Sequence, residues 1–263
     1  MAPPTLTPRL RAEYQRLSDT CVIRSASAGA VEALVAKLAA NRARYEAAGA
    51  PTGTPWHAVA VIHNMEAGQN FNSHLHNGDP LTARTVHVPA GRPPTGKPPF
   101  TWEASAADAL KVKGFDRWKD WSAAGTLYKL EGYNGFGYRM YHPQVLSPYL
   151  WSFSNHYVSG KYVGDGTWSD TAVSQQCGVA VLLRRLAEQG LVDFAAAPTA
   201  PPAAPAPWVR YSADKEIPHG RRLQEFLNGF PGVFVKVDGA PGDRTSDAFR
   251  KVTGRYLEGD PRA

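Results

Sequence analysis

Apolar residues recur at helical spacing in the first third of the chain, and turn residues separate the helices that this spacing predicts. In residues 28–49 the apolar positions lie three or four apart, and Gly49 follows as a stop. A second helix is expected to begin with Thr54 as its N-cap and Pro55 as its first residue, and to end at Gly68. Two well-punctuated helices are therefore predicted early in the chain.

Further helices are predicted in the second half of the large domain. Shorter ones are expected at residues 105–112, 122–133 and 147–153, the last with Ser147 as its cap. Residues 169–190 are apolar over much of a helical circumference. This pattern is typical of a helix at the centre of a core.

A different pattern separates these two groups of helices. Residues 72–88 alternate in part between apolar and polar, and they contain Asn77-Gly78, the favoured centre of a tight hairpin turn. The Pro-rich residues 89–100 are expected to form an irregular loop. The predicted fold class is therefore mainly α, an α+β arrangement with one small antiparallel β-hairpin or sheet after an early helix.

Composition changes most sharply at residues 194–207, where Pro and Ala dominate and charge disappears. Such a segment is typical of an extended, semi-rigid linker. We expect a large domain at residues 1–193 and a small helical domain at residues 208–263.

The whole chain has the composition of a folded protein that favours anionic partners. Hydrophobic residues make up 43% and charged residues 20% of the 263 residues, which argues against wholesale disorder. The formal net charge is +6, so an anionic cell-wall surface is an expected partner. No run of Lys and Arg interleaved with aromatic residues is present, so nucleic acid is not expected as a partner. A monomer is expected.

The cysteines and the N-terminal residues indicate in which cellular compartment the protein is made. Cys21 and Cys177 lack metal-ligand spacing; buried free thiols are expected, with one long-range disulfide as the alternative. The first residues lack the apolar core of a signal peptide, and no stretch approaches the ~20 apolar residues of a membrane span. We therefore expect synthesis without a signal peptide and no transmembrane segment.

Glu66 is the first candidate for chemistry. On a helix it shares a face with His63, Ile62 and Val59, which lie three, four and seven positions earlier, so at least partial burial is expected. Desolvation and the negative end of the helix dipole both raise a carboxyl pKa. A raised pKa suits a general acid near neutral pH, and a structural, hydrogen-bonded glutamate is the alternative.

Asp79 and Thr85 are candidates for a second catalytic group. Asp79 follows Glu66 by 13 residues, and a second carboxylate across a cleft could activate a water or stabilise the transition state. Thr85 could orient a water. The structural alternative is turn chemistry alone, because Asp is common in turns.

The histidines raise the alternative of a zinc site. His57, His63, His74, His76 and His87 surround Glu66 in sequence, but no His-Glu-x-x-His helix is present. His74 and His76 could supply two ligands and leave the third unassigned. No metal and no cofactor are predicted, and a zinc-dependent amidase or peptidase is kept as an alternative.

A family resemblance emerges from the order of these motifs. A helix ending in Met-Glu-Ala-Gly, a turn with Asn-Gly-Asp, and the later Leu-Glu-Gly-Tyr-Asn-Gly resemble the lysozyme superfamily of peptidoglycan-cleaving glycosidases over residues 50–190. The Tyr133-Asn134-Gly135 triplet is similar to the Tyr-Asn-Ala-Gly segment of goose-type lysozymes and soluble lytic transglycosylases. The Glu-Ser and Gly-Leu-Met-Gln signatures of those transglycosylases are missing, since Ala67 follows Glu66.

The small domain resembles the bacterial peptidoglycan-binding module. Leu223-Gln224 matches its Leu-Gln helix, Val237-Asp238-Gly239 its turn, and Gly242, Thr245 and Ala248-Phe249 the start of its second helix, which Asp243 or Thr245 could cap. The structural alternative is a plain small helical bundle.

These resemblances imply a muramidase that cuts the glycan strand of bacterial peptidoglycan, acting on the cell wall like a phage endolysin. Glu66 would protonate the glycosidic oxygen, and Asp79 and Thr85 would assist. Substrate contacts are expected from Tyr133, Asn134, Asn155, His156 and Tyr157. The alternatives are a lytic transglycosylase, the zinc enzyme already named, and a non-catalytic wall-binding protein. A bacterial enzyme exported by a non-standard route is the alternative origin.

Overall fold

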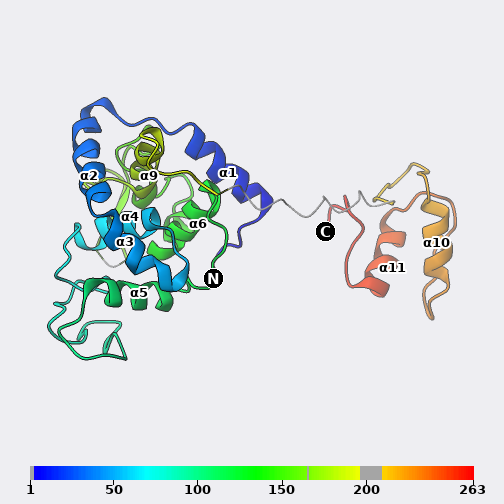
Figure 1. Ribbon diagram of the computed structural model, residues 1–263. Coiled ribbons are helices and arrows are strands. Elements are labelled where there is room, and N and C mark those ends of the chain that lie inside the picture. The colour runs from blue at the N-terminus through cyan, green and yellow to red at the C-terminus, as the bar shows by residue number, and fades with distance from the viewer. Residues whose placement is uncertain (1–2, 165, 196–208) are drawn as a thin grey trace. The chain divides into compact units, whose positions relative to one another are not determined.

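The structure is a computed structural model that describes residues 3–164, 166–195 and 209–263 (Figure 1). The chain divides into two compact units, Met1–Pro198 and Thr199–Ala263. The boundary between them falls inside the Pro/Ala-rich segment 194–207, most of which lies outside the described residues. No helix of the described residues is both long enough and apolar enough to cross a lipid bilayer.

The first unit is mainly helical, as the sequence predicts. Its elements in chain order are α1 (Pro8–Asp19), α2 (Ala28–Ala40), α3 (Arg42–Gly49), α4 (Trp56–Ala67), α5 (Trp102–Val112), α6 (Ala123–Asn134), α7 (Gly137–Tyr141), α8 (Pro148–Trp151), β1 (Lys161–Gly164), β2 (Thr167–Ser169) and α9 (Val179–Glu188), with short 3-10 helices at Ser25–Ser27 and Ala50–Thr52.

Hydroxyl side chains begin several of these helices. Thr7, Thr101 and Ser122 each accept a hydrogen bond from a backbone N–H in the first turn of α1, α5 and α6. The expected cap of α4 is wrong, because its N-cap is Pro55 and no side chain caps it. Ser147 does precede α8, also without a side-chain cap bond.

The centre of the core is α4. Residues Ala58 to His63 are all fully buried, and α4 packs against α3, α6 and α9, which surround it in Figure 1. The prediction that residues 169–190 form the central helix is therefore wrong. Its helical part is only α9, which begins after Gly178 and turns Arg184 and Arg185 toward solvent.

The predicted helix at residues 28–49 is divided at Asn41. Its side-chain amide donates to the Lys37 carbonyl oxygen (2.9 Å), and its backbone separates α2 from α3. An Asn side chain that bonds to the preceding turn competes with the helical ladder. The division lets α3 pack on both α4 and α5.

The predicted fold class is confirmed, but the small sheet lies elsewhere in the chain. The antiparallel pair is β1 with β2, whereas residues 72–88 contribute only an isolated bridge between Ser73 and Pro80. Gly78 N–H donates to the His74 carbonyl (2.9 Å), which makes a wider turn than a two-residue hairpin. Pro80 also lacks the N–H that a strand ladder needs.

Cys21 and Cys177 are free and buried. Burial raises the pKa of Cys21 to about 11 and that of Cys177 to about 12. Both thiols are therefore protonated and weakly nucleophilic near neutral pH.

The second unit is a small helical fold formed by α10 (Gly220–Asn228) and α11 (Asp243–Thr253) around Leu227, Val235 and Ala248. The buried Gln224 side chain accepts hydrogen bonds from the backbone N–H groups of Asp238 (3.0 Å) and Gly239 (2.7 Å). These two bonds tie the predicted Asp-Gly turn to the Leu-Gln helix. The predicted caps of α11 are wrong, because its N-cap is Gly242 and no side chain caps it.

Candidate active-site groove around Glu66

Glu66 lies in the last turn of α4, which ends at Gly68 in the left-handed conformation that glycine favours (φ 55°). The residue as a whole is exposed, whereas Val59 and Ile62 on the same helix are fully buried. The expectation of partial burial therefore fails for the residue as a whole. The helix carries Glu66 from the core to the surface.

The carboxyl group of Glu66 nevertheless has a raised pKa. The protein around it excludes part of its hydration, and this effect outweighs the hydrogen bond that it accepts from the Tyr149 hydroxyl (3.3 Å) and the positive charge of Lys113. Because α4 also points its negative end at this position, ionisation is further disfavoured. Glu66 therefore has the electrostatic setting of a proton donor.

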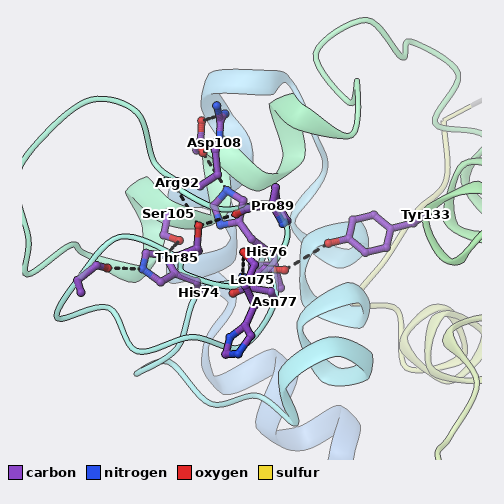
Figure 2. Close-up of polar contacts among 12 residues, drawn as sticks. His74, Leu75, His76, Asn77, Thr85, Pro89, Arg92, Ser105, Asp108 and Tyr133 are labelled. Carbon is purple, nitrogen blue, oxygen red and sulfur yellow. Dashed lines mark hydrogen bonds and ion pairs between the residues drawn. The ribbon is translucent and has the colours of Figure 1, made fainter. Parts of the chain in front are cut away.

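Two buried tyrosines, from α6 and α8, accompany this carboxyl group. Burial first, and then the charge of Glu66, raise the pKa of Tyr133 and of Tyr149. The Tyr133 hydroxyl donates to the Leu75 carbonyl oxygen (3.4 Å), and Figure 2 shows Tyr133 reaching across to this backbone. Three helices and one loop thus converge where α4 ends.

A groove of about 460 Å³ opens beside this point. Tyr149 and Met65 line it next to Glu66, and Tyr138 and Tyr162 contribute aromatic rings packed edge to face with their centroids 5.4 Å apart. The hairpin of β1 and β2 supplies one side of the groove through Tyr162. Open space, aromatic rings and polar groups are thus combined in one groove.

Three residues line the groove without a predicted site role: Tyr149, Tyr162 and Gln176. Gln176 lines the groove and its side chain donates to the Met65 carbonyl oxygen (3.3 Å). No spacing rule connects these residues with Glu66, because only the tertiary packing of a helix, a strand and a loop brings them together. The one signal for Tyr149 is its place directly after the predicted Ser-Pro helix start.

Asp79 lies in the loop after α4 and is only 7% exposed. Its carboxylate accepts hydrogen bonds from the backbone N–H groups of Val86 (2.8 Å) and His87 (3.1 Å), and from the side chain of Asn77 (3.1 Å). The His87 ring nitrogen Nδ1 lies 2.6 Å from its second oxygen. The bond to His87, with the backbone bonds, holds the pKa of Asp79 well below its usual range.

Thr85 is also engaged within this loop. Its hydroxyl donates to the Pro89 carbonyl oxygen (2.5 Å) and accepts from the Arg92 N–H (2.9 Å), as Figure 2 shows. Both Asp79 and Thr85 therefore hold loop backbone in the structure. Their catalytic roles stay predictions.

The predicted substrate residues divide into two places. Tyr133 and Asn134 lie at the end of α6, with Asn134 exposed and lining the groove. Asn155 bonds the backbone of Val22 and Thr20, and His156 lies 2.9 Å from the Leu17 carbonyl oxygen, so both hold the end of α1. For these two, substrate contact stays a prediction without further support.

Tyr157 belongs to the wall behind the groove. It is buried, and its hydroxyl accepts a hydrogen bond from the N–H of Ser174 (3.2 Å), a residue that lines the groove. It therefore supports the lining rather than forming it.

The histidines have separate partners. His63 bonds Tyr45 and Asn70, His74 bonds Ser105 and Ala83, and His76 bonds Asp108, which also pairs with Arg92 (Figure 2). Burial lowers the pKa of His57 and of His63 to about 4, so both are neutral near pH 7. Within residues 3–164, 166–195 and 209–263, no three His, Cys, Asp or Glu side chains are grouped as metal ligands.

The site thus combines a carboxyl group with a raised pKa, the Tyr149 hydroxyl that bonds to it, and an aromatic groove that Tyr149 lines and Glu66 does not. This arrangement can protonate a leaving-group oxygen of a ligand that extends from the groove past Tyr149. Comparison of the chain with protein-family models, with curated proteins and with solved structures gave no match.

Proposed function

We propose that this protein cleaves the glycan strand of bacterial peptidoglycan, with Glu66 as the general acid. The observation that carries the proposal is the Glu66 carboxyl group, whose pKa is raised and which bonds to Tyr149 at the edge of the groove. A carboxylic acid whose pKa is raised keeps its proton to a higher pH and can donate it to a glycosidic oxygen.

Two independent features support peptidoglycan as the substrate. Residues 50–190 resemble the lysozyme superfamily, and the second unit resembles a peptidoglycan-binding module in its Leu-Gln helix and Asp-Gly turn. The net charge of +6 favours attraction to an anionic wall. We propose that the protein acts on the bacterial cell wall in the manner of a phage endolysin.

A specific observation favours a second candidate, the lytic transglycosylase. Hydrolysis by an inverting or retaining mechanism uses a second carboxylate as base or nucleophile. Asp79 already accepts hydrogen bonds from Asn77, Val86 and His87, which leaves it poorly suited to activate a water. A single acid that also acts as base, with the substrate's own group as nucleophile, suits this site as well.

Replacement of Glu66 tests the proposal. Glu66→Gln keeps the size and hydrogen bonding of the side chain but removes its proton, so release of glycan fragments from purified sacculi should fall by about 10²–10⁴-fold. Sacculus binding should stay unchanged. The matched control is Glu46→Gln, on the exposed face of α3, which should keep full activity. Full activity of Glu66→Gln would refute the proposal.

The products distinguish the two chemistries. Mass spectrometry of digested sacculi should give either a hydrolytic end or an anhydro-muramyl end that is lighter by one water. New amino groups without new glycan ends, in a reaction abolished by chelation, would instead support the amidase or peptidase alternative. Wall binding without any cleavage would support the non-catalytic alternative.

A further inference from the structure

A second hollow, of about 420 Å³, shares the backbone of Gly135 with the groove. Gly135 caps α6 with a φ of 98°, a conformation that glycine adopts readily and other residues rarely do. Aromatic rings line this hollow, among them Trp118 stacked on Tyr128 with ring centroids 5.4 Å apart. We call it the lysine hollow, because Lys113 and Lys129 are its charged lining residues.

The two ammonium groups are fixed by backbone carbonyls and aromatic rings. Lys129 Nζ donates to the carbonyl oxygens of Lys113 (2.9 Å) and Gly114 (3.2 Å), and it lies 4.5 Å from the Phe115 ring centroid. Lys113 Nζ donates to the Tyr133 carbonyl oxygen (3.3 Å). Since an ammonium group has three N–H donors, Lys129 retains one and Lys113 retains two for a ligand.

The charge around this hollow is positive. Lys113 and Arg117 both act on Lys129, and Asp116 is the acidic group that opposes them. Burial lowers the pKa of Lys129, which means that its charged form is under-solvated in the absence of an anion. A carboxylate in the hollow would restore that solvation through charge-assisted hydrogen bonds.

The lysine hollow is also close to the proposed proton donor. Tyr133 lines the hollow, and the charge of Glu66 raises the pKa of Tyr133. The charge of Lys113 in turn lowers the pKa of Glu66. Together with the shared Gly135, these couplings place the hollow within reach of a chain held in the groove.

We infer that the lysine hollow binds a carboxylate of the peptide stem carried by the glycan strand, with apolar parts of that substituent against Trp118 and Phe136. The inference rests on the proposed function, because the groove must hold the sugar chain whose side group enters the hollow. It makes Lys113 and Lys129 specificity residues that favour peptide-substituted, anionic glycan over neutral glycan.

The test compares peptidoglycan with the same material after its carboxylates have been converted to amides. The wild-type protein should cleave the native polymer with a kcat/KM about ten-fold higher, because a charge-assisted hydrogen bond is lost on amidation. Lys129→Met keeps the apolar stem against Phe115 and should abolish this preference by lowering the value for the native polymer. The matched control is Lys119→Met, whose exposed ammonium also donates to a backbone carbonyl (Asp116, 2.9 Å). It should keep the preference.

A binding measurement separates this inference from the proposed function. Titration of the folded full chain with a soluble muropeptide should shift the NMR amide signals of Gly132 and Phe136, which line the hollow and not the groove, and Lys129→Met should remove these shifts. No shift in the wild-type protein, or a preference that survives in Lys129→Met, would overturn the lysine hollow even if Glu66→Gln proves inactive. Conversely, shifts at these amides with no cleavage by the wild-type protein would refute the proposed function and leave the hollow standing.

Discussion

The two candidate carboxyl groups of the first unit lie in regions of opposite character. Glu66 stands at the end of a buried helix, accepts one hydrogen bond, from Tyr149, and has a raised pKa. Asp79 stands in a loop, where backbone N–H groups and His87 surround it and lower its pKa. The surroundings of each acid, rather than its residue type, therefore favour the protonated form of Glu66 and the ionised form of Asp79. Only the Asp79 carboxylate is tied to loop backbone.

The difference arises from how each region satisfies its backbone. The backbone carbonyl and N–H groups within α4 hydrogen-bond to one another, so the Glu66 side chain is not needed as a partner for them. The loop at residues 74–92 lacks a strand ladder, and Asp79 and Thr85 replace it with side-chain bonds to Val86, His87 and Arg92. The acceptor sites of a carboxylate in such a loop are occupied by the hydrogen bonds that hold the loop together.

Isosteric replacement should affect activity very differently at the two acids. Glu66→Gln should lose about 10²–10⁴-fold in kcat, whereas Asp79→Asn should keep most of its activity once the folded fraction is taken into account. Turnover of purified sacculi, normalised to folded protein by circular dichroism, gives both values. An equal loss in the two variants would assign Asp79 to the chemistry.

Thermal unfolding as a function of pH should separate the same two acids by sign. The folded pKa of Asp79 lies below its ordinary 3.8, so its stabilisation is present above that value and disappears as the pH falls through the folded pKa. Asp79→Asn should therefore melt several degrees lower than the wild type at pH 7, and the gap should close in acid. A gap independent of pH would contradict the ionised hydrogen-bonded state.

Glu66 should show the opposite sign. Its folded pKa lies above the ordinary 4.5, so its favourable contribution is complete below that value and disappears as the pH rises through the folded pKa. Glu66→Gln should therefore be more stable than the wild type at pH 7, with the difference vanishing near pH 4. A destabilised Glu66→Gln at neutral pH would indicate a structural glutamate.

The sequence predicts these two regions unequally. Periodicity and punctuation indicate α4, α5 and α6 because their buried faces are apolar, whereas α1 gives a weak signal, since only Tyr14 and Leu17 of it are buried. Asn77-Gly78 indicates a hairpin. The loop instead takes its conformation from the hydrogen bonds that Asp79 and Thr85 make across it, and only an isolated bridge forms. One helix alone is enough to single out Glu66 as a candidate, and its catalytic role stays a prediction.

The residues that line the groove cannot be predicted from one helix in this way. Tyr149 and Tyr162 come from separate elements far along the chain, and only tertiary packing brings them to the same groove. Asn155 and His156 lie close to Tyr157 in sequence, but they hold the end of α1. Sequence proximity therefore does not bring these three side chains to one place, because one short segment faces in several directions.

Removal of the hydroxyl that bonds to Glu66 should have a smaller effect on activity. The bond from Tyr149 lowers the pKa of Glu66, so Tyr149→Phe should raise it further. The alkaline limb of the kcat profile should move to higher pH, with a change in maximal rate below about ten-fold for one hydrogen bond. A limb that moves to lower pH would show that another group titrates.

The bond between Tyr133 and Leu75 joins α6 to the loop that contains Asp79, and its loss should change stability only slightly. The Tyr133 hydroxyl donates to the Leu75 carbonyl oxygen at 3.4 Å, which is long for a hydrogen bond, so Tyr133→Phe should cost only about 0.5–1.5 kcal/mol of unfolding free energy. Because Leu75 is buried at the root of the loop, the amide protons of that loop should exchange faster with solvent while those of α4 stay protected. Equal acceleration in α4 would mean that loop and helix unfold as one cooperative unit, and the contrast between Glu66 and Asp79 would then be one of local bonding within a single region.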